Sequence, residues 1–252
     1  MSDYEITVIS AETDHFFSRT ALMYIYMGHM KYENTKPYED WFWEKNRINL
    51  VRKFVKEVDT NNKKLTYEDG GSIDYDVLIL GVGSKSNKFG WPGQDLEGVQ
   101  GLYSYQDLET MEKNSQGITR AVIVGGGLIG IEMTEMLLSR KIPVTFLVRE
   151  ENFWDPVFPI EEAKMINRHI HEHHVDLRLS TELKEILDDG NGRVKAVTTK
   201  DGEEIDCQLV GLTVGVSPNI DFLKESNVET DRGIMVDEYL QTNLPDVYAI
   251  GD

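Results

Sequence analysis

The chain has 252 residues, 40% of them hydrophobic and 10% aromatic, which is typical of a folded globular protein and not of a disordered one. Its 26 Lys and Arg against 44 Asp and Glu give a net charge of −18, which opposes binding to nucleic acids and anionic membranes. The single cysteine, Cys207, excludes an internal disulfide, and no apolar run has the length of a membrane span or the form of a signal peptide. These features predict a cytoplasmic protein.

The first part of the chain is rich in predicted strands. Residues 5–10 (EITVIS) predict a strand that no glycine loop precedes. Runs of β-branched residues at 48–58, 62–67 and 73–80 predict a small β-meander. The stretch 81–101 is rich in Gly, Ser and Pro, and it predicts a linker.

The second part alternates helices and strands. After a short helix near 108–114, the sequence predicts a buried strand at 121–124, a helix that ends near Ser139 and a second strand at 144–148. Further along, we expect a helix at about 160–172 and strands near 175–178, 194–199 and 205–213. This alternation predicts an α/β fold with a parallel sheet.

A glycine-rich loop joins the strand AVIV to the following helix. Gly125, Gly127 and Gly130 match the pattern G-x-G-x-x-G, in which the glycines permit a tight turn, close approach of a pyrophosphate and close packing of helix on strand. The start of the helix, at Leu128 and Ile129, offers N–H groups and partial positive charge to phosphates. A turn needed only for packing is the alternative, but the strand-loop-helix-strand context favours a dinucleotide site.

The choice of nucleotide depends on the end of the second strand, where NAD enzymes usually carry an acid for the ribose 2′-hydroxyl. Here Val148 stands at that position, followed by Arg149 and Glu150. Arg149 is compatible with a 2′-phosphate or with a solvated surface residue, and Glu150 is compatible with NAD. The sequence therefore leaves NADH and NADPH both open.

Four segments resemble motifs of one family. They are YDVLILGVGS at 75–84, GGGLIGIE at 125–132, GVSPN at 215–219 and GIMVDEYLQTNLPDVYAIGD at 233–252. The chain is thereby similar to the FAD-dependent pyridine nucleotide-disulfide oxidoreductases. The similar branch contains coenzyme A disulfide reductases, NADH oxidases, rubredoxin or ferredoxin reductases and nitrite reductase flavin domains.

The resemblance implies a Rossmann-like FAD/NAD(P)-binding fold. In this arrangement an NAD(P)H-binding domain, residues 106–220, is inserted into an FAD-binding domain formed by 1–105 and 221–252. Family members begin with their own G-x-G-x-x-G loop for the FAD pyrophosphate and end with an interface domain, and this sequence matches neither. We therefore expect a chain truncated at both ends, with an incomplete FAD domain that binds FAD weakly alone.

The resemblance also implies a set of flavin contacts. Glu12 matches the residue that holds the adenosine ribose, with Ser10 as the other candidate, and Arg19 matches a basic residue beside the flavin nucleotide. The terminal carboxylate, Asp252, is implied to contact the ribityl chain. The remaining implied cofactor contacts are Gly81, Val82, Gly83, Ser84 and, in GVSPN, Gly215.

The segment TALMY, residues 20–24, bears on the reaction. Coenzyme A disulfide reductases and NADH oxidases carry a redox cysteine in the matching place, where this chain has Thr20. A threonine forms neither a mixed disulfide nor a sulfenic acid, so we expect no thiol intermediate. Cys207 lies in an apolar run that predicts a buried strand, and we expect it to behave as a small hydrophobe.

Glu132 follows the third glycine on the first turn of the helix. The helix dipole favours a carboxylate there whatever the function. The matching glutamate of the family lies near the nicotinamide and flavin rings, so the resemblance implies a role at the reacting rings for Glu132. Ferredoxin-reductase relatives pair this glutamate with a lysine, and Tyr24 stands in its place here.

Two other groups of residues invite a functional interpretation. His169 and His173 have i,i+4 spacing, but without an HExxH order or a nearby cysteine we expect solvated histidines and no metal site. The aromatic residues Trp41, Phe42, Trp43 and Trp91 suggest a docking surface, yet we expect them to pack within the protein.

These inferences predict a flavin-dependent NAD(P)H oxidoreductase without a redox cysteine. Hydride passes from NAD(P)H to FAD, and electrons then pass directly to an acceptor such as a small electron-carrier protein, a quinone, oxygen or an attached reductase domain. Acidic carriers would be repelled by the net charge of −18 unless a local basic patch compensates. The alternative is an NAD(P)(H)-binding module that retains no FAD and is not catalytic alone.

Overall fold

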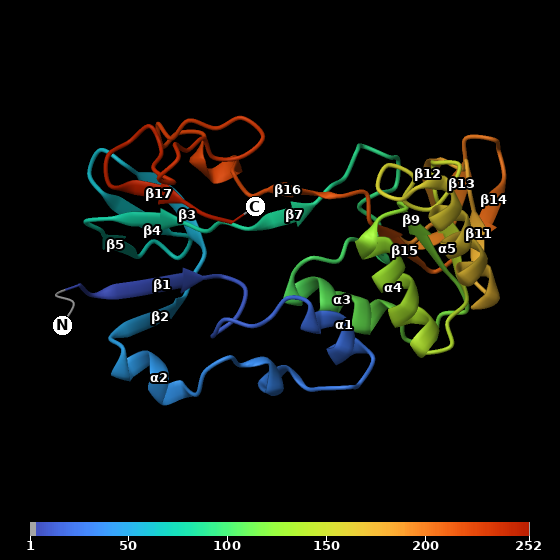
Figure 1. The fold of residues 1–252 in the computed structure, drawn as a ribbon, viewed down its shortest axis with the longest axis horizontal. Coiled ribbons are helices and arrows are strands. Elements are labelled where there is room, and N and C mark those ends of the chain that lie inside the picture. Colours follow the sequence, from blue (N-terminus) through green and yellow to red (C-terminus); the bar gives the residue numbers. More distant parts are fainter. Residues whose placement is uncertain (1–3, 252) are drawn as a thin grey trace. The chain divides into compact units, whose positions relative to one another are not determined.

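The computed structural model describes residues 4–251, and the chain forms two compact units (Figure 1). The first unit contains the chain up to Ser18, Glu33–Lys85 and the chain from Ser217 onward. The second contains Arg19–Tyr32 and Ser86–Val216. The chain passes between the units near Ser18, near Tyr32 and through two short strands, β7 (Ser84–Ser86) and β16 (Val216–Pro218).

The second unit is built on a five-stranded parallel sheet, which confirms the predicted α/β class. In spatial order the strands are β11 (Asp176–Arg178), β10 (Val144–Leu147), β9 (Ala121–Val124), β15 (Leu209–Leu212) and β8 (Val99–Gln100). The helices of this unit are α1 (Ala21–Tyr26), α3 (Tyr105–Asn114), α4 (Leu128–Ser139) and α5 (Ile160–Glu172).

Burial of apolar side chains explains this sheet. Every residue of β9, β10 and β15 is buried, as expected for parallel strands covered on both faces. Helix α4 packs on β9 and β10, and its Met133, Met136 and Leu137 are fully buried. Helix α3 starts with a capping box, in which Ser104 and Asp107 accept each other's backbone N–H groups.

A three-stranded antiparallel sheet completes the second unit. It consists of β12 (Leu183–Asp188), β13 (Val194–Thr199) and β14 (Glu204–Asp206). Its apolar residues share a core with β9 and β15, and this core includes Cys207 and the partly buried Trp91. The expected burial of Cys207 is confirmed at 0% exposure, and the expected packing of Trp91 is confirmed as well.

The first unit contains two parallel ladders and a meander. Strand β1 (Ile6–Ser10) pairs with β2 (Ile48–Arg52), and β6 (Leu78–Leu80) pairs with β17 (Val247–Ala249). The second pairing confirms that the C-terminal segment returns to the strand predicted at 73–80. The antiparallel meander is β3 (Val55–Asp59), β4 (Lys64–Tyr67) and β5 (Ser72–Asp74), and the remaining elements are η1 (Tyr32–Thr35), α2 (Asp40–Lys45) and η2 (Asp221–Leu223).

Several predicted strand boundaries are wrong. The run 48–58 is two strands in different sheets, because β2 pairs with β1 whereas β3 joins the meander. The runs 73–80 and 205–213 are likewise divided, into β5 and β6 and into β14 and β15. The predicted linker 81–101 contains β7 and β8. A continuous run of β-branched and apolar residues predicts strand structure but carries no mark of where the chain changes its pairing partner.

The aromatic residues of α2 depart from the expected packing. No residue of this helix is buried, and Trp41 is 60% exposed with the Lys45 ammonium 5.0 Å from its ring centroid. Phe42 stacks on Tyr38 at a centroid distance of 4.0 Å, and Trp43 contacts Phe42 edge-on. These rings therefore pack on one another in a partly exposed cluster.

Within residues 4–251, none of the helices combines the length and the hydrophobicity that a membrane span requires.

Candidate functional site

The glycine loop after β9 has the geometry of a phosphate-binding turn. Gly125 has φ +117°, and a Cβ there would lie 2.5 Å from the Thr213 carbonyl oxygen. A Cβ on Gly130 would lie 2.3 Å from the Gly125 carbonyl oxygen, so both positions require glycine. Around Gly127, in contrast, a Cβ would meet no described atom within 4 Å. The loop is therefore tight where it packs and open at its middle glycine.

Helix α4 begins directly at this opening. Gly127 is the N-cap residue, and no side chain of the described chain caps it. Because the first N–H groups of a helix lack partners within the helix, the N–H groups of Leu128 and Ile129 remain able to bind an anion. Space at Gly127 and donors at the helix start together fit the pyrophosphate of a dinucleotide.

The neighbouring strand end brings the predicted Gly215, and with it Thr213, to this edge of the sheet. Thr213 follows β15, and its N–H and Oγ1 both donate to the Val124 carbonyl at 2.9 Å. Gly215 comes two residues later with φ +91°, and its carbonyl accepts the Asn87 N–H at 3.0 Å. Ligands of open α/β sheets bind outside the carboxyl ends of the strands, which is where Gly125, Thr213 and Gly215 lie.

Arg149 and Glu150 form an ion pair after β10. Nε and Nη2 of Arg149 donate to Oε1 of Glu150 at 3.2 and 2.8 Å. The arginine side chain is 73% exposed and the glutamate side chain 28% exposed. Both residues thus follow β10, the strand next to β9, and their charges are paired with each other.

Glu132 lies on the second turn of α4, and the prediction that it lies on the first turn is wrong because the helix already begins at Leu128. Its side chain is half-buried and makes no hydrogen bond or ion pair with residues 4–251. Burial, with Glu135 as a second cause, raises the pKa of the Glu132 carboxyl. An unpaired, partly desolvated carboxylate is a costly arrangement, which is common at functional sites.

Sequence reasoning missed the residue that anchors α1. Arg140, at the end of α4, forms a two-point ion pair with Glu112 of α3 and donates to the Tyr26 carbonyl. Its guanidinium lies 3.5 Å from the ring centroid of Tyr26, which is 1% exposed. This Arg140 clamp fixes the helix that starts after Thr20. Arg140, Tyr26 and Glu112 are far apart in the sequence, so no local sequence pattern indicates that they interact.

Arg19 and Thr20 precede α1 in the second unit. Nη1 of Arg19 donates to the Tyr103 carbonyl at 2.6 Å, and the guanidinium lies 4.4 Å from the Tyr103 ring centroid. Thr20 is the N-cap residue of α1, without a capping hydrogen bond from its side chain among the described residues. The structure thus ties Arg19 to the segment before α3.

The turn Gly81–Ser84 follows β6 in the first unit. Asn219 holds it: Nδ2 donates to the carbonyls of Val82 at 3.2 Å and Ser84 at 3.0 Å, and its N–H donates to that of Gly83 at 2.9 Å. Asn219 is the last residue of the GVSPN motif. The motif therefore included the residue that holds this turn, although no role was assigned to Asn219 from the sequence. The turn is well defined, but the sequence contains a single G-x-G-x-x-G, which lies in the second unit.

Glu12 also belongs to the first unit. It follows the end of β1, is half-buried, and its N–H donates to Ser10 Oγ at 3.2 Å. The two candidate ribose ligands are therefore adjacent. Asp252 lies outside the described residues.

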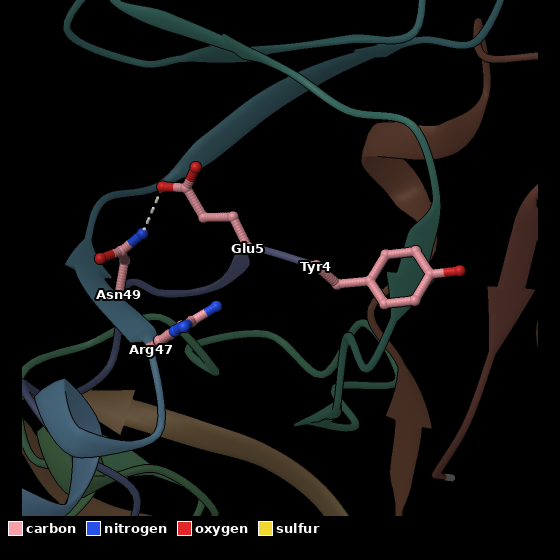
Figure 2. Close-up of a pocket in the computed structure, with 4 residues that line it drawn as sticks. All are labelled: Tyr4, Glu5, Arg47 and Asn49. Atoms are coloured by element: carbon pink, nitrogen blue, oxygen red, sulfur yellow. Dashed lines mark hydrogen bonds between the residues drawn. The ribbon is translucent and has the colours of Figure 1, made fainter. Parts of the chain in front are cut away.

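A shallow cavity of about 310 Å³ lies at the start of β1 and β2 (Figure 2). Tyr4, Glu5, Arg47 and Asn49 line it, and Asn49 Nδ2 donates to Glu5 Oε1 at 2.7 Å. It lies at the amino ends of these parallel strands, opposite to the carboxyl ends where nucleotides bind. This cavity is therefore no part of the predicted site.

The side chains of His169 and His173, which have i,i+4 spacing, contact each other. Their ring centroids are 4.2 Å apart, and Nδ1 of His173 lies 2.9 Å from the His169 carbonyl oxygen. Within the described part of the chain, no group of three or more His, Cys, Asp or Glu side chains is arranged to hold a metal ion.

Comparisons with known proteins identify relatives along the whole chain. A nitrite reductase [NAD(P)H] from Bacillus subtilis (strain 168) is 30% identical over 252 residues, which cover 99% of this chain and 31% of that protein. An NADH-rubredoxin oxidoreductase from Clostridium acetobutylicum is 32% identical over 218 residues, covering 84% of this chain and 52% of that protein. The chain therefore spans about a third of the first relative and about half of the second.

A solved structure has the same fold. The ferredoxin reductase of the CYP199A2 system from Rhodopseudomonas palustris matches 99% of this chain and 62% of its own length, with a TM-score of 0.91 and 24% identity. Residues 1–252 also match the family described as "Pyridine nucleotide-disulphide oxidoreductase". The chain belongs to the pyridine nucleotide-disulphide oxidoreductase family.

Proposed function

We propose that the chain is the nucleotide-handling part of a flavin-dependent NAD(P)H oxidoreductase that passes electrons to its acceptor without a protein thiol. The observation that carries the proposal is the loop Gly125–Gly130, tight at both ends and open at Gly127 beside the start of α4. When bound, NAD(P)H supplies a hydride and FAD carries the electrons onward. The second unit takes the nicotinamide nucleotide, and the first unit contributes one side of the flavin site.

The chain's own residues act mainly by positioning. The N–H groups of Leu128 and Ile129 bind the pyrophosphate, and the glycines at 125–127 let the backbone approach it. Glu132 lies one turn further along α4, where its half-buried carboxylate orients the nicotinamide end. Hydride transfer depends on alignment of two rings, so Glu132 acts by placement and not as a proton donor.

The flavin contacts are proposed from the first unit and from Arg19. Asn219 holds the turn of Gly81, Val82, Gly83 and Ser84 in one conformation, which suits a backbone contact with a flavin. Glu12, beside Ser10, offers a carboxylate to a ribose, and Arg19 offers a guanidinium to the nucleotide. Asp252 is proposed from the sequence alone.

The state of the single cysteine of this chain supports the proposed electron transfer without a thiol. Burial, with Asp206 as a second cause, raises the pKa of Cys207 to about 12, so the thiolate is scarce at neutral pH. Thr20 stands at the start of α1, at the position where coenzyme A disulfide reductases and NADH oxidases carry a redox cysteine. Thiol reagents should therefore leave electron transfer intact and modify Cys207 only as the protein unfolds. Rapid loss of transfer on modification of Cys207 would contradict a thiol-free route.

The acceptor is proposed to be a small electron-carrier protein. Two relatives are named for such carriers: the NADH-rubredoxin oxidoreductase and a putidaredoxin reductase solved in covalent complex with putidaredoxin. The net charge of −18 makes a carrier with a basic docking face the better fit. Transfer rates that fall with rising salt would support such a partner.

A second candidate is a nucleotide-binding module that does not retain FAD. The observation that favours it is the exposed apolar surface of the first unit's parallel ladders, where Ile6, Val8 and Ile79 are 48%, 46% and 61% exposed. A visible absorption spectrum of the purified 252-residue chain separates the candidates. A stoichiometric flavin band favours the reductase in this chain alone, whereas NAD(P)H binding without that band favours the module.

A further inference from the structure

Residues 235–240 of the first unit form a run in which every residue is exposed. Four of them are apolar or aromatic: Met235, Val236, Tyr239 and Leu240 are 52%, 40%, 75% and 48% exposed. Single exposed apolar side chains are common on protein surfaces, whereas several of them gathered in one place are typical of interaction sites. We call residues 235–240 the apolar turn.

Hydrogen bonds around Asp237 hold the apolar turn in one conformation. Its Oδ1 accepts the N–H groups of Tyr239 and Gln241, each at 2.9 Å. Its own N–H donates to the Gln241 carbonyl at 2.9 Å, and its carbonyl accepts the Leu240 N–H at 3.0 Å. The exposed side chains are therefore displayed on an ordered backbone, which lowers the entropy cost of docking a partner.

Leu240 has a backbone conformation that disfavours its side chain. Its φ is +65°, in the left-handed region that favours glycine. The side chain is also exposed, so packing within the fold does not account for a leucine at this position. Residues held in such costly conformations are typical of functional sites.

The apolar turn lies close to the proposed flavin contacts of the first unit. The Leu240 carbonyl accepts the Ala249 N–H at 3.0 Å, and Gln241 pairs with Tyr248 in an antiparallel bridge. Strand β17, which ends at Ala249, thus runs next to the turn, and it pairs with β6. Residues 81–84, which follow β6, are among the proposed flavin contacts. A redox protein that docks on the apolar turn would therefore come near the flavin.

Acidic residues lie within the apolar turn and on its N-terminal side in the sequence. From residue 225 to residue 241 the chain has five carboxylates and one cation, Arg232. The five carboxylates belong to Glu225, Glu229, Asp231, Asp237 and Glu238. Within residues 4–251, none of the five forms an ion pair with a lysine or arginine. Their negative charge is therefore left for a partner to neutralise.

We propose that the apolar turn and these carboxylates form a docking surface for a small redox protein whose docking face is rich in lysine or arginine. The inference rests on the proposed function, in which such a protein accepts the electrons. Tyr239 and Leu240 supply the apolar centre of the contact, because large side chains on an ordered backbone bury much area at a low entropy cost. The carboxylates attract the cations around that centre and fix the orientation of the partner.

The test is a calorimetric titration of the 252-residue chain with cytochrome c, a small redox protein with a lysine-rich face. We expect binding that weakens with rising salt and is lost when the lysines of cytochrome c are acetylated. Tyr239→Ser and Leu240→Gly should each weaken binding by about tenfold. Glu238→Lys should weaken it by roughly fivefold to tenfold. Leu240→Gly should unfold near the wild-type temperature, because glycine adopts this φ without strain.

Two matched controls lie elsewhere in the first unit. Glu44→Lys makes the same change of charge on an exposed residue of α2, and Tyr4→Ser removes a tyrosine that is 76% exposed. Both should leave the affinity for cytochrome c within about twofold of the wild type. Equal losses in Glu238→Lys and Glu44→Lys, or full affinity in Tyr239→Ser and Leu240→Gly, would overturn the docking surface alone. A folded wild type that binds cytochrome c through this turn but neither NADH nor NADPH would contradict the proposed function while supporting the docking surface.

Discussion

Two groups of parallel strands in this chain have similar sequences and different surroundings. Strands β9 and β10 read AVIV and VTFL, and each of their residues is buried. Strands β1 and β6 read ITVIS and LIL, and exposed apolar side chains alternate along them. The β-branched sequence specifies a strand in both groups, but burial depends on what covers the sheet. The glycine loop follows a strand of the fully buried group.

The largest effect should come from the loop itself. Gly130→Val places a side chain where even a Cβ would lie 2.3 Å from the Gly125 carbonyl oxygen, inside a buried helix turn. We expect a loss of about 4 kcal/mol or more in the free energy of unfolding, and no measurable NAD(P)H binding. Urea unfolding and calorimetry measure the two losses.

Gly127→Ala is the matched control for the loop. Its φ is −109° and its Cβ would have open space, so we expect a change in stability within about 0.5 kcal/mol. Nucleotide affinity should nevertheless fall by about tenfold or more, because the methyl group occupies the path of the pyrophosphate. If Gly130→Val unfolded no more easily than Gly127→Ala, the packing account of the loop would be wrong.

One pair of isoleucines compares the two strand groups directly. Ile123 in β9 is fully buried, and Ile123→Ala should cost about 3 kcal/mol in stability. Ile79 in β6 is 61% exposed, and Ile79→Ala should cost less than about 1 kcal/mol. Similar costs at both positions would mean that β6 is as well covered in solution as β9.

The Arg140 clamp should have an intermediate effect. Arg140→Ala removes the ion pair with Glu112 and the contact with the Tyr26 ring, and we expect a loss of about 1–2 kcal/mol. Arg140→Lys keeps the charge but loses the planar fork, so it should restore less than half of that loss. Faster hydrogen exchange in α1 than in α5 would localise the change, whereas uniform exchange would contradict a local clamp.

The smallest effect concerns Glu132. Because burial raises its pKa in the folded chain, its stabilising contribution is complete below the unfolded pKa of about 4.3 and is lost as pH rises through the folded pKa. Glu132→Gln should therefore match the wild type in acid and be slightly more stable near pH 7, as thermal unfolding across pH would measure. Glu135→Gln should shift stability in the same direction by less. Destabilisation by Glu132→Gln at neutral pH would indicate a partner for the carboxylate.

Sequence patterns predicted the local parts of the structure best. The helix at 160–172 and the strand at 194–199 were predicted with the bounds observed for α5 and β13, because their periodicity is local. The division of 48–58 was missed because pairing of β2 with β1 is decided forty residues away in the chain. Asn219 bonds to Val82, 137 residues away, and Arg140 bonds to Tyr26, 114 residues away. Local sequence patterns do not reveal contacts between residues so far apart.

The most direct test of the account is a calorimetric titration of the wild-type chain and Gly127→Ala with NADH and NADPH. We expect a nicotinamide nucleotide to bind the wild type at one site per chain. In Gly127→Ala we expect a large loss of affinity at unchanged stability. Equal affinity of the two proteins, or no binding by a folded wild type, would contradict a nucleotide site on the loop Gly125–Gly130.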